Sequence, residues 1–125
     1  MLNARFVLTA AHCVTTYGVP VAAENFEVKL GAHHLKTSGK MFKVRHVFSH
    51  ALYSPAAIRN DIALLKLTSH VEFSTTIAPV CLPHPSKKHI QDGTPVTVSG
   101  WGATKFQGDM IQFDYQVAHS LIFVF

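Results

Sequence analysis

His12 is the residue of this 125-residue chain whose surroundings best suit chemistry. It lies in the stretch TAAHC (9–13), after an apolar run and directly before Cys13. An imidazole takes up and returns a proton near neutral pH, and it acts as a general base when its ring is held in one orientation. A carboxylate on Nδ1 is the usual way to hold it. The stretch therefore predicts a proton-transfer site, provided that a carboxylate elsewhere reaches His12.

Asp61 is the carboxylate whose position best suits a partner of His12. It follows Asn60 and begins DIALLKL (61–67), an apolar stretch typical of a buried strand. A partly buried carboxylate needs a partner, and a histidine would supply one. From the residues alone, the favoured interpretation is that Asp61 caps the start of the strand and that His12 is an ordinary core residue, because a pair so far apart in sequence is weak evidence for a contact. The other acidic residues are Glu24, Glu27, Glu72, Asp92, Asp109 and Asp114.

The remaining histidines and the basic residues are expected to be ordinary surface or packing groups. His33 and His34 would point to opposite faces of a strand, and His46 and His50 have a helical spacing in a stretch typical of strand and loop. We therefore expect no metal and no cofactor. The net charge is +4, but lysines and arginines alternate with apolar residues. This pattern favours a solvated surface, and we expect no nucleic-acid partner.

Short strands separated by turns must position these residues. Apolar, β-branched and aromatic content predicts strands over 5–9, 26–30, 42–48, 61–67 and 94–100. The period of two in 26–30 places Phe26, Val28 and Leu30 on one face. TAAHC is long enough for one helical turn, with Thr9 as its cap. The pattern indicates one all-β domain, a barrel or a sandwich. No apolar run reaches the roughly 20 residues of a membrane-spanning helix.

Four ordered motifs resemble those of trypsin-like, or chymotrypsin-fold, serine endopeptidases. They are VLTAAHC (7–13), NDIALLKL (60–67), VCLP (80–83) and VSGWG (98–102). The resemblance runs from about Leu2 to Lys105. It implies hydrolysis of protein or peptide substrates between two antiparallel β-barrels. Residues 1–105 would then be a partial protease domain. They would form most of the N-terminal barrel, which stays incomplete, and the beginning of the second barrel.

The resemblance assigns roles residue by residue. His12 matches the catalytic base and acid, and Asp61 matches the carboxylate that orients it. Cys13 matches a cysteine usually bridged to one upstream, and Cys81 matches one that many members bridge to a propeptide or another segment. The two are therefore not expected to pair. Many trypsins bind calcium in the loop that matches 32–43, but no carboxylate occurs there, and we expect no calcium site.

The chain departs from the family pattern near both ends. None of its serines lies in a GDSGGP segment, which carries the nucleophile in the family, and the IVGG and CGGSL segments are absent. We therefore expect a fragment that lacks the nucleophile, the oxyanion donors and the specificity pocket, and that is inactive alone. Residues 106–125 form a divergent apolar tail ending in SLIFVF. Unpaired strand edges and an unformed bridge at Cys13 predict marginal stability for the isolated chain.

Two further expectations concern role and location. The alternative to a partial protease is a non-catalytic, protease-like binding or decoy module, although the retention of His12 and Asp61 counts mildly against it. The full-length relative is expected to be secreted. No signal peptide is expected in this chain, because His12 interrupts the apolar stretch 6–14 and no small-residue cleavage site follows.

Overall fold

The computed structural model describes residues 1–84, 93–102 and 116–121, and most of the tail expected over 106–125 lies outside them. Strands and two short 3-10 helices make up the regular structure of the described residues, which contain no α-helix. None of the described helices is long and apolar enough to cross a membrane. The all-β prediction is therefore confirmed.

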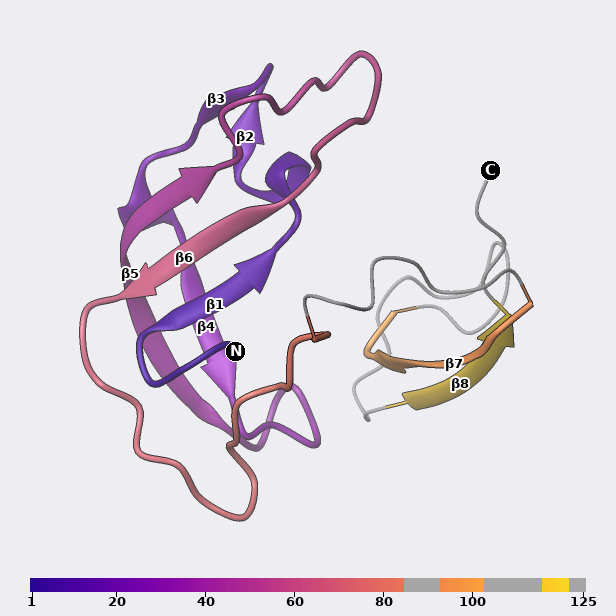
Figure 1. Ribbon diagram of the computed structural model, residues 1–125. Helices are drawn as coiled ribbons and strands as arrows, with labels where there is room; N and C mark the ends of the chain where they lie inside the picture. Colours follow the sequence, from indigo (N-terminus) through magenta and orange to yellow (C-terminus); the bar gives the residue numbers. More distant parts are fainter. Residues whose placement is uncertain (85–92, 103–115, 122–125) are drawn as a thin grey trace. The chain divides into compact units, whose positions relative to one another are not determined.

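The chain forms two compact units. The first contains Met1–Leu30 and Lys40–Leu82, and the second contains Gly31–Gly39 and the residues from Pro83 onward. In the first unit, four antiparallel strands form one curled sheet in the order β1-β6-β5-β4 (Figure 1). Their bounds are Phe6–Thr9 for β1, Glu27–Leu30 for β4, Lys40–Ser49 for β5 and Ala63–Leu67 for β6. Each lies within two residues of its predicted bounds, and the curled sheet is consistent with the chymotrypsin-like barrel that the motifs imply.

The core of the first unit lies against one face of β6. Ala63, Leu65 and Leu67 are buried, whereas the two residues between them are half-buried, as the alternation of a strand requires. The buried cluster also contains Ala11, Val14, Val44, Val71 and Ile77. Phe26, Val28 and Leu30 pack against it, which confirms their predicted common face.

A β-bulge bends the longest strand. The register between β5 and β6 shifts between Val44 and His46, so Arg45 is the extra residue on β5. A bulge strengthens the local twist and lets a strand turn around a core. This explains how β5 pairs with β6 along one part of its length and with β4 along another.

Short elements join β1 to β4. They are η1 (Ala11–Cys13), β2 (Thr15–Thr16), β3 (Val19–Pro20) and η2 (Ala23–Asn25). Tyr17 and Gly18 both have positive φ, 50° and 83°, which is the geometry of a two-residue type I′ hairpin turn between β2 and β3. The predicted helical turn at TAAHC exists as η1, but the cap predicted at Thr9 is wrong. The residue before η1 is Ala10, and no side chain caps the helix, because the turn is a single 3-10 turn that begins one residue later.

The second unit contains a two-stranded antiparallel sheet. Its strands are β7 (Pro95–Gly100) and β8 (Gln116–Leu121). Gly93, with φ 79°, makes the turn that precedes β7. The indole Nε1 of Trp101 donates a hydrogen bond of 2.9 Å to the carbonyl oxygen of His33. This contact ties the segment Gly31–Gly39 to the unit that contains β7.

Substitution of Leu67 tests whether the core lies against β6, because the side chain of Leu67 is 0% exposed. We expect Leu67→Ala to lower the free energy of unfolding by about 2–5 kcal/mol, since it leaves a cavity in a packed core. Urea unfolding followed by circular dichroism measures this change. Leu52→Ala is the matched control, because Leu52 is 72% exposed and a surface substitution changes stability by no more than about 0.5 kcal/mol. Equal effects of the two substitutions would contradict the proposed core.

Candidate active site

The pairing of β1 with β6 brings His12 and Asp61 together. In this register Thr9 lies opposite Ala63. His12 follows Thr9 closely along the chain, and Asp61 precedes Ala63 by two residues. Because the strands are antiparallel, the segment leaving β1 and the segment entering β6 lie at the same end of the sheet.

Small residues and local hydrogen bonds hold His12 in place. Ala11 is 0% exposed, so the turn packs closely against the core. Its carbonyl oxygen accepts hydrogen bonds from the backbone N–H of Val14 at 3.0 Å and from Oγ1 of Thr15 at 2.9 Å. These bonds close η1 and fix the direction in which the side chain of His12 leaves the backbone.

Asn60 shapes the backbone that presents Asp61. Its φ is 55°, a left-handed conformation that asparagine adopts more readily than most residues. Its side-chain Nδ2 donates a hydrogen bond of 2.8 Å to the carbonyl oxygen of Leu52. The N–H of Ile62 donates to the carbonyl oxygen of Asn60 at 2.8 Å, which forms a three-residue turn centred on Asp61. An asparagine directly before Asp61 is the sequence signal for this left-handed turn, and this role of Asn60 was not predicted.

The carboxylate of Asp61 binds His12 with both oxygens. Oδ1 accepts a hydrogen bond of 2.8 Å from the backbone N–H of His12, and Oδ2 lies 2.6 Å from Nδ1 of its ring. An ionised carboxylate only accepts hydrogen bonds, so Nδ1 must carry a proton. The neutral ring then has its lone pair on Nε2. The contact predicted between these two residues is therefore present, and it fixes both the ring orientation and the tautomer.

Hydrogen bonding stabilises the charged form of Asp61. The side-chain hydrogen bond with His12 lowers the pKa of Asp61 most, and the bond from the backbone N–H of His12 lowers it further. Burial opposes this shift, because desolvation disfavours a carboxylate, whereas the charge of His12 and the backbone of Ala11 act in the lowering direction. Asp61 is thus held as an anion beside the imidazole.

The other side of the His12 ring is open to solvent. The side chain of His12 is 64% exposed, compared with 20% for that of Asp61. Nε2 lies 3.4 Å from Sγ of Cys13, a contact that was not predicted. The adjacency of the two residues in TAAHC was its only signal. The site thus offers a fixed base with an accessible nitrogen.

Neither metal ligation nor a disulfide is found among the described residues. They contain no group of three or more histidine, cysteine, aspartate or glutamate side chains placed to hold a metal ion. His46 stacks on Phe48, with ring centroids 5.8 Å apart. Cys13 and Cys81 are both exposed free thiols. Three of the other acidic residues, Asp92, Asp109 and Asp114, lie outside the described part of the chain.

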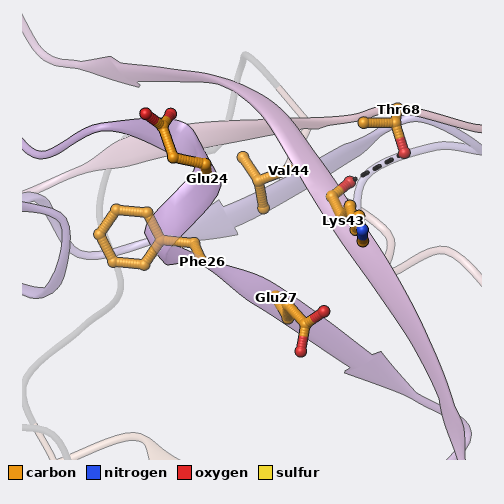
Figure 2. A pocket seen from close by; sticks show the side chains of 6 residues that line it. All are labelled: Glu24, Phe26, Glu27, Lys43, Val44 and Thr68. Atoms are coloured by element: carbon orange, nitrogen blue, oxygen red, sulfur yellow. Dashed lines mark hydrogen bonds between the residues drawn. The ribbon is translucent and has the colours of Figure 1, made fainter.

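A separate pocket lies at the far end of β6. It has a volume of about 280 Å³, and Glu24, Phe26, Glu27, Lys43, Val44 and Thr68 line it (Figure 2). Oγ1 of Thr68 donates a hydrogen bond of 3.3 Å to the carbonyl oxygen of Lys43. Asp61 precedes β6 and Thr68 follows it, so the rise of a strand places them about 15 Å or more apart. This pocket therefore cannot take part in chemistry at His12.

Comparison with known proteins assigns the chain to a family. The family model described as Trypsin matches residues 1–121. The chain is 32% identical over 117 residues to a trypsin of Phaedon cochleariae, which covers 94% of this chain and 44% of that protein. It is 40% identical over 100 residues to cathepsin G of Mus musculus, covering 78% and 35%. It is 34% identical over 105 residues to the clotting factor G beta subunit of Tachypleus tridentatus, covering 83% and 34%. The chain thus spans less than half the length of these curated relatives.

The lowered pKa of Asp61 gives stability a defined pH dependence. The stabilisation is fully present above the usual aspartate range of about pH 4, and it is lost as the pH falls through the lowered pKa. We expect Asp61→Asn to lower the urea midpoint at pH 7. The difference in midpoint between this variant and the unsubstituted chain should disappear as the pH falls below about pH 4. Urea unfolding at a series of pH values measures this. Glu72→Gln, at an exposed position, is the control and should leave the midpoint unchanged. A difference in midpoint that grows at low pH would contradict a stabilising contact between ionised Asp61 and His12.

Proposed function

Because the chain belongs to the trypsin family of serine proteases, we propose that it contributes the base and its orienting carboxylate to serine-type hydrolysis of peptide bonds in a longer polypeptide. The observation that carries this proposal is the double contact of Asp61 with His12, through the backbone N–H and through Nδ1. Protein or peptide substrates are part of the proposal, as is an extracellular location.

His12 would act through its accessible nitrogen. Nε2 takes the proton of a serine hydroxyl as that oxygen attacks the scissile carbonyl, and it later gives the proton to the departing amine. Asp61 remains ionised throughout and stabilises the imidazolium that forms between these steps. The fixed tautomer matters because a proton on Nε2 would leave no lone pair to accept the serine proton.

Among the described residues, no serine hydroxyl hydrogen-bonds the ring of His12. Within the described residues, the ring of His12 hydrogen-bonds only Asp61 and Cys13. None of the serines of this chain occurs in a GDSGGP segment. We therefore propose that the 125-residue chain hydrolyses no peptide bond by itself, because a base without its nucleophile and oxyanion donors gives little rate enhancement.

A fluorophosphonate probe tests the inactivity of the chain alone. This reagent phosphonylates a serine only when a neighbouring base activates the hydroxyl. We expect no labelling of the purified chain, as measured by intact-protein mass spectrometry, under conditions in which an active trypsin is labelled completely. Stoichiometric labelling would show that an activated serine is present and would overturn the proposal of inactivity.

The roles of His12 and Asp61 are tested in a polypeptide that supplies the nucleophile. We expect Asp61→Asn to lower kcat about 10⁴-fold, because the ring loses its acceptor on Nδ1, and His12→Ala to lower it about 10⁶-fold. Steady-state hydrolysis of a peptide substrate measures both, with Glu72→Gln as the matched control at an exposed site. Unchanged kcat in both variants would contradict the assigned roles, whereas no hydrolysis by the parent polypeptide would favour a non-catalytic binding or decoy module.

A further inference from the structure

Basic side chains gather on the outer face of the two inner strands of the sheet. β5 and β6 lie between β4 and β1, so both of their hydrogen-bonding edges are occupied. Along β5, Lys43 and Arg45 are exposed, whereas Val44 between them is buried. Successive side chains of a strand point to opposite faces. The alternation of basic and apolar residues therefore places the cations of β5 together on the solvent side.

The β-bulge adds a further basic side chain to this face. Val44 is buried and Val47 packs against the core, but Arg45 and His46 between them are both exposed. A regular strand would turn one of this pair inward, and the extra residue of the bulge lets both point outward. On the neighbouring strand, Lys66 lies directly opposite His46 in the register of β5 and β6.

The fold leaves most of this charge unneutralised, and we call the four residues the basic patch: Lys43, Arg45, His46 and Lys66. β1, β5 and β6 contain no acidic residue. Glu27 of β4 lies opposite Lys43, but no carboxylate of the described residues forms an ion pair with the lysines or the arginine of the patch. These three side chains are charged at neutral pH and stay available to an anion.

The aromatic rings beside the patch are in contact with its basic groups. Nζ of Lys66 lies 5.8 Å from the centroid of the Phe6 ring, and the ring of His46 stacks on that of Phe48 with centroids 5.8 Å apart. An ammonium held over a ring keeps N–H groups that can donate to an anion. The bases of single-stranded nucleic acids need aromatic faces on which to stack. The arrangement therefore favours a partner that is recognised through its negative charge alone.

We propose that the basic patch binds a sulfated polysaccharide. Such a linear chain carries sulfate groups, which are permanent anions, at close intervals and has no bases to accommodate. Neighbouring strands lie about 4.8 Å apart and alternate residues of one strand about 6.6 Å apart, so the cations of the patch follow one another at similarly close intervals. Proteins that grip duplex DNA by neutralising about six to ten phosphates need more cations than the three permanent ones of this patch.

Fluorescence anisotropy of a labelled heparin fragment tests the proposal, because heparin is a highly sulfated polysaccharide. We expect the full chain to bind it with an affinity that falls as the salt concentration rises. The slope of log K against the logarithm of the salt concentration should be about −3, because three cations displace the counterions of the polyanion. Chemically desulfated heparin keeps the sugar chain and should show no measurable binding.

Substitutions within the patch test which residues make these contacts. Arg45→Gln and Lys66→Gln should each weaken binding and make the slope shallower by about one, whereas Arg45→Lys keeps the charge and should leave the slope unchanged. Glu27→Gln should strengthen binding, because it removes the carboxylate opposite Lys43. Arg59→Gln is the matched control, since Arg59 is an exposed arginine in the loop between β5 and β6 and its substitution removes the same charge. Circular dichroism verifies that each variant is folded.

Three results would overturn the proposal. The first is an absence of heparin binding by the folded chain, and the second is an unchanged slope in folded Arg45→Gln and Lys66→Gln variants. The third is equal affinity for a DNA duplex, which would show that the patch does not select a sulfated polysaccharide. The measurement involves no peptide hydrolysis, so the inference fails or holds independently of the proposed protease function.

Discussion

The antiparallel register of β1 and β6 is the constraint on which the site depends. With Thr9 opposite Ala63, the chain that leaves β1 and the chain that enters β6 meet at one end of the sheet. A shift by one residue would turn Ala63, Leu65 and Leu67 away from the core and would move Asp61 relative to His12. Burial of one face of β6 thus fixes the register, and the register fixes the distance between carboxylate and imidazole.

The strands and the two site residues could be predicted because each has a local signal. The alternation in 26–30 and the apolar stretch at 61–67 follow from burial on one face or on both, and both strands are present. Asp61 stands at the start of a buried strand, where an unpaired carboxylate is costly, so a partner was expected. The motif resemblance then identified that partner as His12, and the contact is 2.6 Å.

The remaining features depend on interactions that no short stretch encodes. The bulge at Arg45 arises from the pairing of β5 with β6, which joins residues distant in sequence. The cap expected at Thr9 is absent because Thr9 is still paired with Ala63 in the sheet when the 3-10 turn begins. The left-handed backbone at Asn60 depends on a hydrogen bond to Leu52 that only the folded loop provides. In each case tertiary contacts decided between conformations that the local sequence allows.

The chemistry of His12 is set by whichever group lies against Nε2. Asp61 determines the orientation of the ring and the position of its proton, and it does so within a single compact unit. This half of the site is therefore complete without a nucleophile. In the proposed function, this base activates a serine oxygen that other residues supply. An oriented imidazole thus provides general-base reactivity, and the surrounding chain selects the substrate.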